Sequence, residues 1–191
     1  MLYGIIGKKG AGKTLFLTYL LKKYSDSDNK VKIYTNYTLK GINFEEINFK
    51  EIFKNDIEIK NAIVGIDEIY LIADCRTSMT KMNKLISYLL YQTRKAGVDI
   101  FYTAVSYSTI DIRLRRGTDG IFFPNLYVDG KKVLNPESLT RIKMDQIIKR
   151  GCLIQLKGLF HTEYATHNFS VDNPQNYFKY YSSYQMIKPT I

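Results

Sequence analysis

The sequence predicts an α/β fold: a mainly parallel central sheet flanked by helices, followed by an antiparallel β addition and a terminal helix. The first 116 residues alternate short apolar runs, typical of buried strands, with stretches of helical periodicity. A glycine-rich turn joins the first run to the first helix. Beyond residue 120, turn residues separate runs rich in β-branched and aromatic side chains. The 191 residues form one predicted domain, with 1–116 as its α/β core and 117–191 as a β-rich extension packed on that core.

The glycine-rich turn lies between an apolar run at 2–6, which predicts a buried strand, and a leucine-rich stretch at 14–24, which predicts a helix. It fits the phosphate-loop pattern G-x-x-x-x-G-K-[ST]. Glycines let backbone N–H groups turn inward around a phosphate, and the helix N-terminus adds partial positive charge. The predicted ATP-binding residues are Gly7, Lys8, Lys9, Gly10, Ala11, Gly12, Lys13 and Thr14. Lys13 would reach the β- and γ-phosphates and the Thr14 hydroxyl would ligate Mg²⁺.

A second apolar run, at 62–66, ends in the acids Asp67 and Glu68. Such a run predicts a buried parallel strand with a functional carboxyl end. In a phosphate-loop protein, Asp67 would hold Mg²⁺ through water, and Glu68 would polarise the water that attacks the γ-phosphate. The two motifs together predict the fold of a P-loop NTPase and an ATP-hydrolysing site.

The remaining elements follow in order along the chain. In the core we expect a strand over 31–39, a short helix over 44–53, a helix over 79–96, a strand over 98–105 and a capped helical turn over 106–116. In the extension we expect a hairpin of 121–128 with 131–134, a helix over 139–149, and strands over 152–156 and 159–165 joined at Lys157-Gly158. The aromatic tail from Tyr177 is expected to pack on the domain, with base stacking as the alternative.

The net charge of +10, from 28 Lys and Arg against 18 Asp and Glu, suits a polyanionic partner, although a diffuse lysine-rich surface would give the same balance. No apolar run of 18 residues is present, so no transmembrane segment is expected, nor is a signal peptide. Cys75 and Cys152 predict two free thiols in a reducing cytoplasm. The spacing of His161 and His167 is a poor metal-binding pattern.

Taken in order, these motifs resemble the FtsK/HerA superfamily of DNA-pumping ATPases. After the phosphate loop, the resemblance rests on Ile-Tyr-Thr-Asn-Tyr at 33–37, Gly-Ile-Asp-Glu at 65–68, Gln-Thr-Arg-Lys-Ala-Gly at 92–97, and the runs at 100–104 and 111–115. It covers about residues 1–116 and is closest to the genome-packaging ATPases of membrane-containing icosahedral viruses, especially archaeal ones. The related zonula-occludens-toxin-like assembly proteins of filamentous phages share part of the pattern but usually carry a transmembrane segment.

This resemblance implies a homo-oligomeric, often hexameric, ring that moves double-stranded DNA in the host cytoplasm, with capsid or internal-membrane vertex proteins as candidate partners. ATP would lie between subunits, where Arg94 matches the arginine-finger region and Arg113 and Arg115 are rivals. The family often has a sensor glutamine where this chain has Val105 and Ser106, which leaves Ser106 as a weak substitute. The alternatives are a small-molecule kinase and a nucleotide-dependent virion-assembly protein without motor activity.

Overall fold

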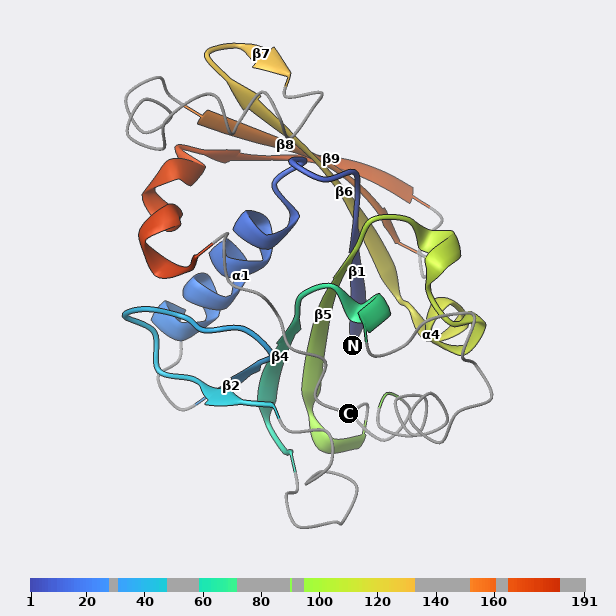
Figure 1. Cartoon of the computed structure of the whole chain (residues 1–191). Coiled ribbons are helices and arrows are strands. Elements are labelled where there is room, and N and C mark those ends of the chain that lie inside the picture. The colour runs from blue at the N-terminus through green and yellow to red at the C-terminus, as the bar shows by residue number, and fades with distance from the viewer. Residues whose placement is uncertain are drawn as a thin grey trace.

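The computed structural model describes residues 1–27, 31–47, 59–71, 90, 95–132, 152–160 and 165–182. Within these ranges nine strands form one sheet in the order β3-β2-β4-β5-β1-β6-β8-β9, with β7 paired to β6 (Figure 1). The strands are β1 (Leu2–Ile6), β2 (Lys32–Thr35), β3 (Glu45–Glu46), β4 (Ala62–Ile66), β5 (Val98–Ala104), β6 (Gly120–Val128), β7 (Lys131–Lys132), β8 (Cys152–Phe160) and β9 (Ala165–Asp172). The helices are α1 (Lys13–Ser27) and α4 (Ile112–Gly117), with the 3-10 helices η1 (Ile69–Leu71), η3 (Tyr107–Thr109) and η4 (Pro174–Tyr180).

Strands β1 to β6 run parallel to their neighbours among themselves, and β7, β8 and β9 add antiparallel pairs. This confirms the predicted mainly parallel α/β fold. Strand β5 lies between β1 and β4, with Thr103 opposite Ile5 and Tyr102 opposite Ile66. Because parallel strands share a direction, the carboxyl ends of β1, β4 and β5 meet at one edge of the sheet. The phosphate loop and the two acids both begin at that edge.

The extension joins the core through a shared strand. Strand β6, expected to belong wholly to the extension, pairs parallel with β1 on one side and antiparallel with β8 on the other. The hairpin of β6 and β7 turns at Asp129 and Gly130 as predicted, and both residues have positive φ. One continuous sheet therefore carries both parts of the chain.

The helix expected over 44–53 is wrong in the described residues. This segment begins instead as strand β3, because Glu45 pairs with Tyr34 of β2 and the Ile47 N–H donates to Thr35 O at 2.8 Å. Residues 48–58 lie outside the described ranges. The strand expected over 31–39 is confirmed only for Lys32–Thr35.

The turn expected at Lys157-Gly158 is also wrong, because both residues lie inside the unbroken strand β8. A Cβ on Gly158 would lie 3.0 Å from a ring carbon of Phe160 and 3.0 Å from one of Phe169. The glycine therefore leaves room for aromatic rings that pack across β8 and β9, and it does not mark a turn.

Helices cover both faces of the sheet. Helix α1 lies on one face with η4 beside it (Figure 1), where Leu17, Leu21 and Ile63 are buried in one apolar cluster. A Cβ on Gly65 of β4 would lie only 2.8 Å from Leu21 Cδ1, so α1 packs closely on this strand. The other face holds a second cluster that includes Leu114 of α4.

The described part of the tail packs on the domain as expected, against α1 and residues 39–40. The ring of Tyr177 in η4 meets that of Tyr19 edge-on at 5.0 Å. The Lys40 N–H donates to the Tyr180 carbonyl at 2.7 Å, and an isolated bridge joins Leu39 to Tyr181. Of the helix expected over 79–96, only residues 90, 95 and 96 are described, all of them helical. The helix expected over 139–149 lies outside the described residues.

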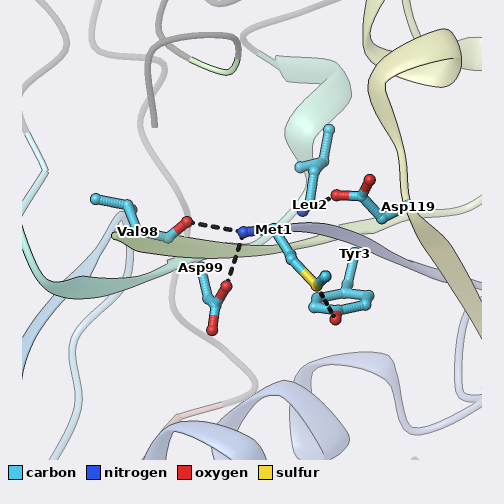
Figure 2. Close-up of polar contacts among 6 residues, drawn as sticks. All are labelled: Met1, Leu2, Tyr3, Val98, Asp99 and Asp119. Carbon is cyan, nitrogen blue, oxygen red and sulfur yellow. Dashed lines mark hydrogen bonds and ion pairs between the residues drawn. The ribbon is translucent and has the colours of Figure 1, made fainter. Parts of the chain in front are cut away.

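Polar contacts fix the amino ends of the central strands (Figure 2). The Met1 amino group donates to the Val98 carbonyl at 2.9 Å and to Asp99 Oδ1 at 2.7 Å, and the Leu2 N–H donates to Asp119 Oδ2 at 2.8 Å. These contacts hold β1 between β5 and β6 at the end opposite the phosphate loop. In the part of the chain that is described, no helix combines the length and apolar character needed to span a membrane.

Candidate nucleotide site

The phosphate loop lies at the carboxyl end of β1 and leads directly into α1. The Gly7 N–H donates to the Ala104 carbonyl of β5 at 3.1 Å, which fixes the start of the loop against that strand. Gly12 has φ of 87°, in the left-handed region that side-chain-bearing residues rarely adopt. A Cβ on Gly12 would lie 3.4 Å from Ile154 Cδ1 and 3.5 Å from Leu126 Cβ. Strands β6 and β8 therefore pack directly behind the loop.

Lys13 is the first residue of α1, and its side chain turns back over the loop. Its Nζ donates to the Lys8 carbonyl at 3.1 Å. Burial lowers the pKa of Lys13, while the charges of Asp67 and Glu68 act in the opposite direction. The structure thus brings the predicted phosphate-binding cation near both predicted acids. The side chains of Lys8 and Lys9 are exposed.

Asp67 follows β4 directly, and its carboxylate accepts hydrogen bonds from two threonines. Thr14 Oγ1 lies 3.0 Å from Oδ2 and 3.2 Å from Oδ1, and Thr103 Oγ1 lies 2.6 Å from Oδ1. The residue is only 7% exposed. Burial raises the pKa of the Asp67 carboxyl, although the hydrogen bonds from Thr103 and Thr14 favour its charged form. The two predicted Mg²⁺ ligands, Thr14 and Asp67, are therefore in direct contact.

Glu68 has an unusual backbone conformation, with φ of 53°. A non-glycine residue in the left-handed region carries roughly 1–3 kcal/mol of strain, which persists only where its surroundings enforce it. Here the Glu68 N–H donates to Thr103 Oγ1 at 2.8 Å, and its carbonyl accepts from the Leu71 N–H at 2.9 Å. Burial and the neighbouring Glu68 carboxylate raise the pKa of Tyr70 to about 12. The two backbone hydrogen bonds hold this turn in place directly after β4.

Thr103 and Asn36 belong to this site, and neither was expected from the sequence. Thr103 connects both acids, because its hydroxyl accepts from the Glu68 N–H and donates to the Asp67 carboxylate. Asn36 follows β2, where its Nδ2 donates to the Asp67 carbonyl at 2.8 Å and its Oδ1 accepts from the Asp67 N–H at 2.7 Å. The sequence offers one indication for each: Thr103 lies near the end of an apolar run, and Asn36 lies within the Ile-Tyr-Thr-Asn-Tyr run.

Of the three candidate arginines, Arg113 and Arg115 lie on α4, and Arg94 is outside the described ranges. Arg113 donates through Nε and Nη2 to the two carboxylate oxygens of Asp111, both at 2.8 Å. The guanidinium of Arg115 lies 5.9 Å from the Tyr107 ring centre. Two residues after α4, the Asp119 N–H donates to Leu2 O, which is at the opposite end of β1 from the phosphate loop.

Ser106 caps η3 through a 3.3 Å hydrogen bond from the Ser108 N–H. This contact uses the Ser106 hydroxyl within its own turn. The sensor role considered for Ser106 has no further contact in its favour among the described residues.

The donors at Asp67 suit a hard divalent cation, because carboxylate and hydroxyl oxygens are the ligands that Mg²⁺ prefers. A buried carboxylate with a raised pKa also gains from a nearby positive charge. Among the described residues no group of three or more His, Cys, Asp or Glu is placed to hold a metal ion.

A phosphate loop, a buried Asp and an adjacent Glu at the carboxyl ends of parallel strands define a P-loop ATPase. Residues 3–125 match the model of the ATPase family associated with various cellular activities (AAA). The chain belongs to this family. No curated protein sequence matches the chain.

Solved structures share the fold at low sequence identity. The N-terminal domain of zonular occludens toxin from Neisseria meningitidis superposes with a TM-score of 0.60 and 15% identity, over 95% of this chain and 98% of that one. The DNA-packaging ATPase B204 from Sulfolobus turreted icosahedral virus has a TM-score of 0.55 and 14% identity, over 87% and 95%. The genome packaging NTPase B204 from Sulfolobus turreted icosahedral virus 2, solved in complex with ATP-gammaS, has a TM-score of 0.53 and 12% identity, over 87% and 95%.

Proposed function

We propose that this ATPase is a motor that translocates double-stranded DNA and packages a viral genome into a capsid. The observation that carries the proposal is the excess of ten positive charges on a chain whose nucleotide site needs only a few of them. Lys and Arg side chains that neutralise DNA phosphates release counterions and so bind DNA without sequence preference. The structure that shares this fold and is described as a DNA-packaging ATPase adds support.

The chemistry assigned to the site is transfer of the γ-phosphoryl group to water. Lys13 would neutralise charge on the β- and γ-phosphates, and the loop N–H groups would hold them. Thr14 and Asp67 would hold Mg²⁺, which supplies positive charge to the phosphoryl oxygens. Glu68 would accept a proton from the attacking water. Its backbone turn, with φ of 53° and a hydrogen bond to Thr103, fixes the position of the Cα atom from which this side chain extends.

The site would be completed by a second copy of the chain. We propose a ring of six subunits, in which an arginine of the neighbouring subunit would contact the γ-phosphate. Arg94 is the first candidate. Arg113 and Arg115 lie on α4, after which the chain reaches the amino end of β1 at Asp119. As the rival candidates they would likewise contact the nucleotide of a neighbouring subunit. The exposed Lys8 and Lys9 would face that boundary.

The same proposal places the protein in the host cytoplasm, where it would meet capsid or internal-membrane vertex proteins. A second candidate function is nucleotide-dependent virion assembly without motor activity. It is favoured by the sequence resemblance to zonula-occludens-toxin-like assembly proteins, and the fold shared with the zonular occludens toxin domain is compatible with it. A small-molecule kinase is less favoured, because two adjacent carboxylates at the strand end suit water as the phosphoryl acceptor.

The test is the ATP hydrolysis rate with and without double-stranded DNA, measured beside the mass of the protein in solution with ATP. We expect DNA to raise the rate and ATP to favour a ring, and we expect Glu68→Gln to abolish turnover while ATP still binds. A monomer whose hydrolysis ignores DNA would refute the motor. Nucleotide binding without DNA-stimulated hydrolysis would support the assembly protein, and transfer of phosphate to nucleosides would support the kinase.

A further inference from the structure

The stretch at 33–37 contains Tyr37, a residue that the chemistry above does not use. Its side chain is 4% exposed, and its hydroxyl lies 3.1 Å from Thr18 Oγ1, which is fully buried on α1. We propose that Tyr37 is a positioning residue that keeps the Thr14–Asp67 pair in register for Mg²⁺-nucleotide binding, acting through Thr18 and Asn36. This inference rests on the Mg²⁺ role proposed above.

The first two turns of α1 each connect to a different strand end. Thr14 and Thr18 are four residues apart, so their side chains lie on the same face of the helix, one turn apart. Thr14 contacts the carboxylate of Asp67, which follows β4. Thr18 contacts Tyr37, which follows β2. The position of α1 is therefore tied to both strands at once.

Asn36 and Tyr37 close this set of contacts into a circuit. Tyr37 follows Asn36 in the chain, and Asn36 binds both the N–H and the carbonyl of Asp67. The path from Thr14 to Asp67, Asn36, Tyr37 and Thr18 thus returns to α1. In such a closed path, loss of the Thr18–Tyr37 hydrogen bond would let α1 and Asp67 move relative to each other. Neither Thr18 nor Tyr37 needs to contact Mg²⁺ or nucleotide for this effect.

Tyr37 is itself held rigidly. Its carbonyl accepts a hydrogen bond from the Thr35 hydroxyl. Two residues on, Leu39 bridges to Tyr181 and so places the tail beside this segment. Burial raises the pKa of Tyr37 well above its usual value, which keeps the phenol neutral and its hydrogen bond intact at working pH. A buried hydroxyl with a defined partner on α1 is suited to setting the distance between the helix and this segment.

The experiment compares Tyr37→Phe and Thr18→Val with a matched control, Tyr102→Phe. Tyr102 is fully buried and its hydroxyl lies 2.7 Å from Thr118 Oγ1, so the control also removes one buried hydroxyl pair. The primary measurement is calorimetric binding of a non-hydrolysable ATP analogue as Mg²⁺ is varied, with EDTA giving metal-free affinity. Thermal melting of each variant measures the purely structural effect.

We expect Tyr37→Phe and Thr18→Val each to raise the Mg²⁺ concentration for half-maximal binding roughly three- to tenfold, the size expected for one buried hydrogen bond. Metal-free affinity should stay unchanged, and the double variant should be no worse than either single one. Tyr102→Phe should lower the melting temperature similarly without changing the Mg²⁺ dependence.

Equal Mg²⁺ dependence in the wild type, both variants and the control would overturn the role of Tyr37 and leave the Mg²⁺ role standing. If the nucleotide affinity of the wild-type protein does not change with Mg²⁺ concentration, the proposed Mg²⁺ role is refuted, and this inference is refuted with it. If Tyr37→Phe fails to fold, Thr18→Val tests the same link from the helix.

Discussion

Replacing Thr103 with valine should damage stability and catalysis together, because one hydroxyl serves both acids. The side chain is fully buried, and valine matches its shape while losing the oxygen. The change removes a hydrogen bond to the Asp67 carboxylate at 2.6 Å and leaves the Glu68 N–H without its 2.8 Å acceptor. A hydrogen bond to a charged group contributes about 1.5–3 kcal/mol, and an unpaired buried donor costs about 1–3 kcal/mol.

Part of that loss is recovered because Asp67, with its pKa already raised, can bind a proton in the variant. We therefore expect a net destabilisation of about 2–4 kcal/mol, which lowers the melting temperature of a chain of this size by roughly 5–15 °C. Because the Glu68 turn loses its anchor, kcat should fall at least about tenfold, with a smaller change in KM.

The assay pairs thermal melting with steady-state ATP hydrolysis, and Thr103→Ser is the matched control. Serine keeps the hydroxyl and loses only a methyl group, so it should cost about 1 kcal/mol and keep most of the activity. A Thr103→Val protein that melts and turns over like the wild type would refute the reasoning. Equal losses in the serine and valine variants would show that packing of the methyl group, and not the hydroxyl, matters.

The site and its surroundings support three further predictions. Because burial raises the pKa of Asp67 above its usual value, the protonated carboxyl contributes stability that is present at low pH and lost as pH rises through the folded pKa. Thermal melts in EDTA should show this decline with pH, and Asp67→Asn should flatten it and raise the melting temperature at neutral pH while abolishing Mg²⁺-dependent binding. Gly12→Ala should cost about 1–3 kcal/mol through its φ of 87° and its contact with Ile154, and should remove ATP binding measured by calorimetry. Arg113→Ala should cost about 2–4 kcal/mol in chemical denaturation, because it leaves Asp111, which is 1% exposed, without its ion-pair partner, whereas an unchanged midpoint would show that the pair contributes nothing.

The parts of the site that are continuous in the chain could be predicted from the sequence. The loop from Gly7 to Thr14 and the pair Asp67-Glu68 are each local patterns, and apolar runs located the strands that carry them. Thr103 and Asn36 could not be predicted in this way, because their roles depend on which strands are neighbours in the sheet. Only when β5 lies between β1 and β4, with β2 on the far side of β4, do these two side chains meet Asp67.

The elements that were wrongly predicted have a similar cause. The sequence predicts a turn at Gly158 because local preference favours glycine in turns, but the rings of Phe160 and Phe169 determine its place in a strand. The sequence predicts a helix at Glu45 and Glu46, among charged neighbours, but pairing with β2 makes them an edge strand. In both cases long-range pairing outweighed local propensity.

The close packing of α1 on Gly65 has a consequence for how this enzyme can fail. A single methyl group at position 65 would meet Leu21 at 2.8 Å and would have to push the helix away from the sheet. Thr14 at the start of that helix would then retreat from Asp67, two residues beyond the glycine. The spacing between Thr14 and Asp67, the two proposed Mg²⁺ ligands, therefore depends on the absence of a side chain at position 65 in the hydrophobic interior. A screen for inactive but folded variants should recover position 65 alongside the residues that touch ATP.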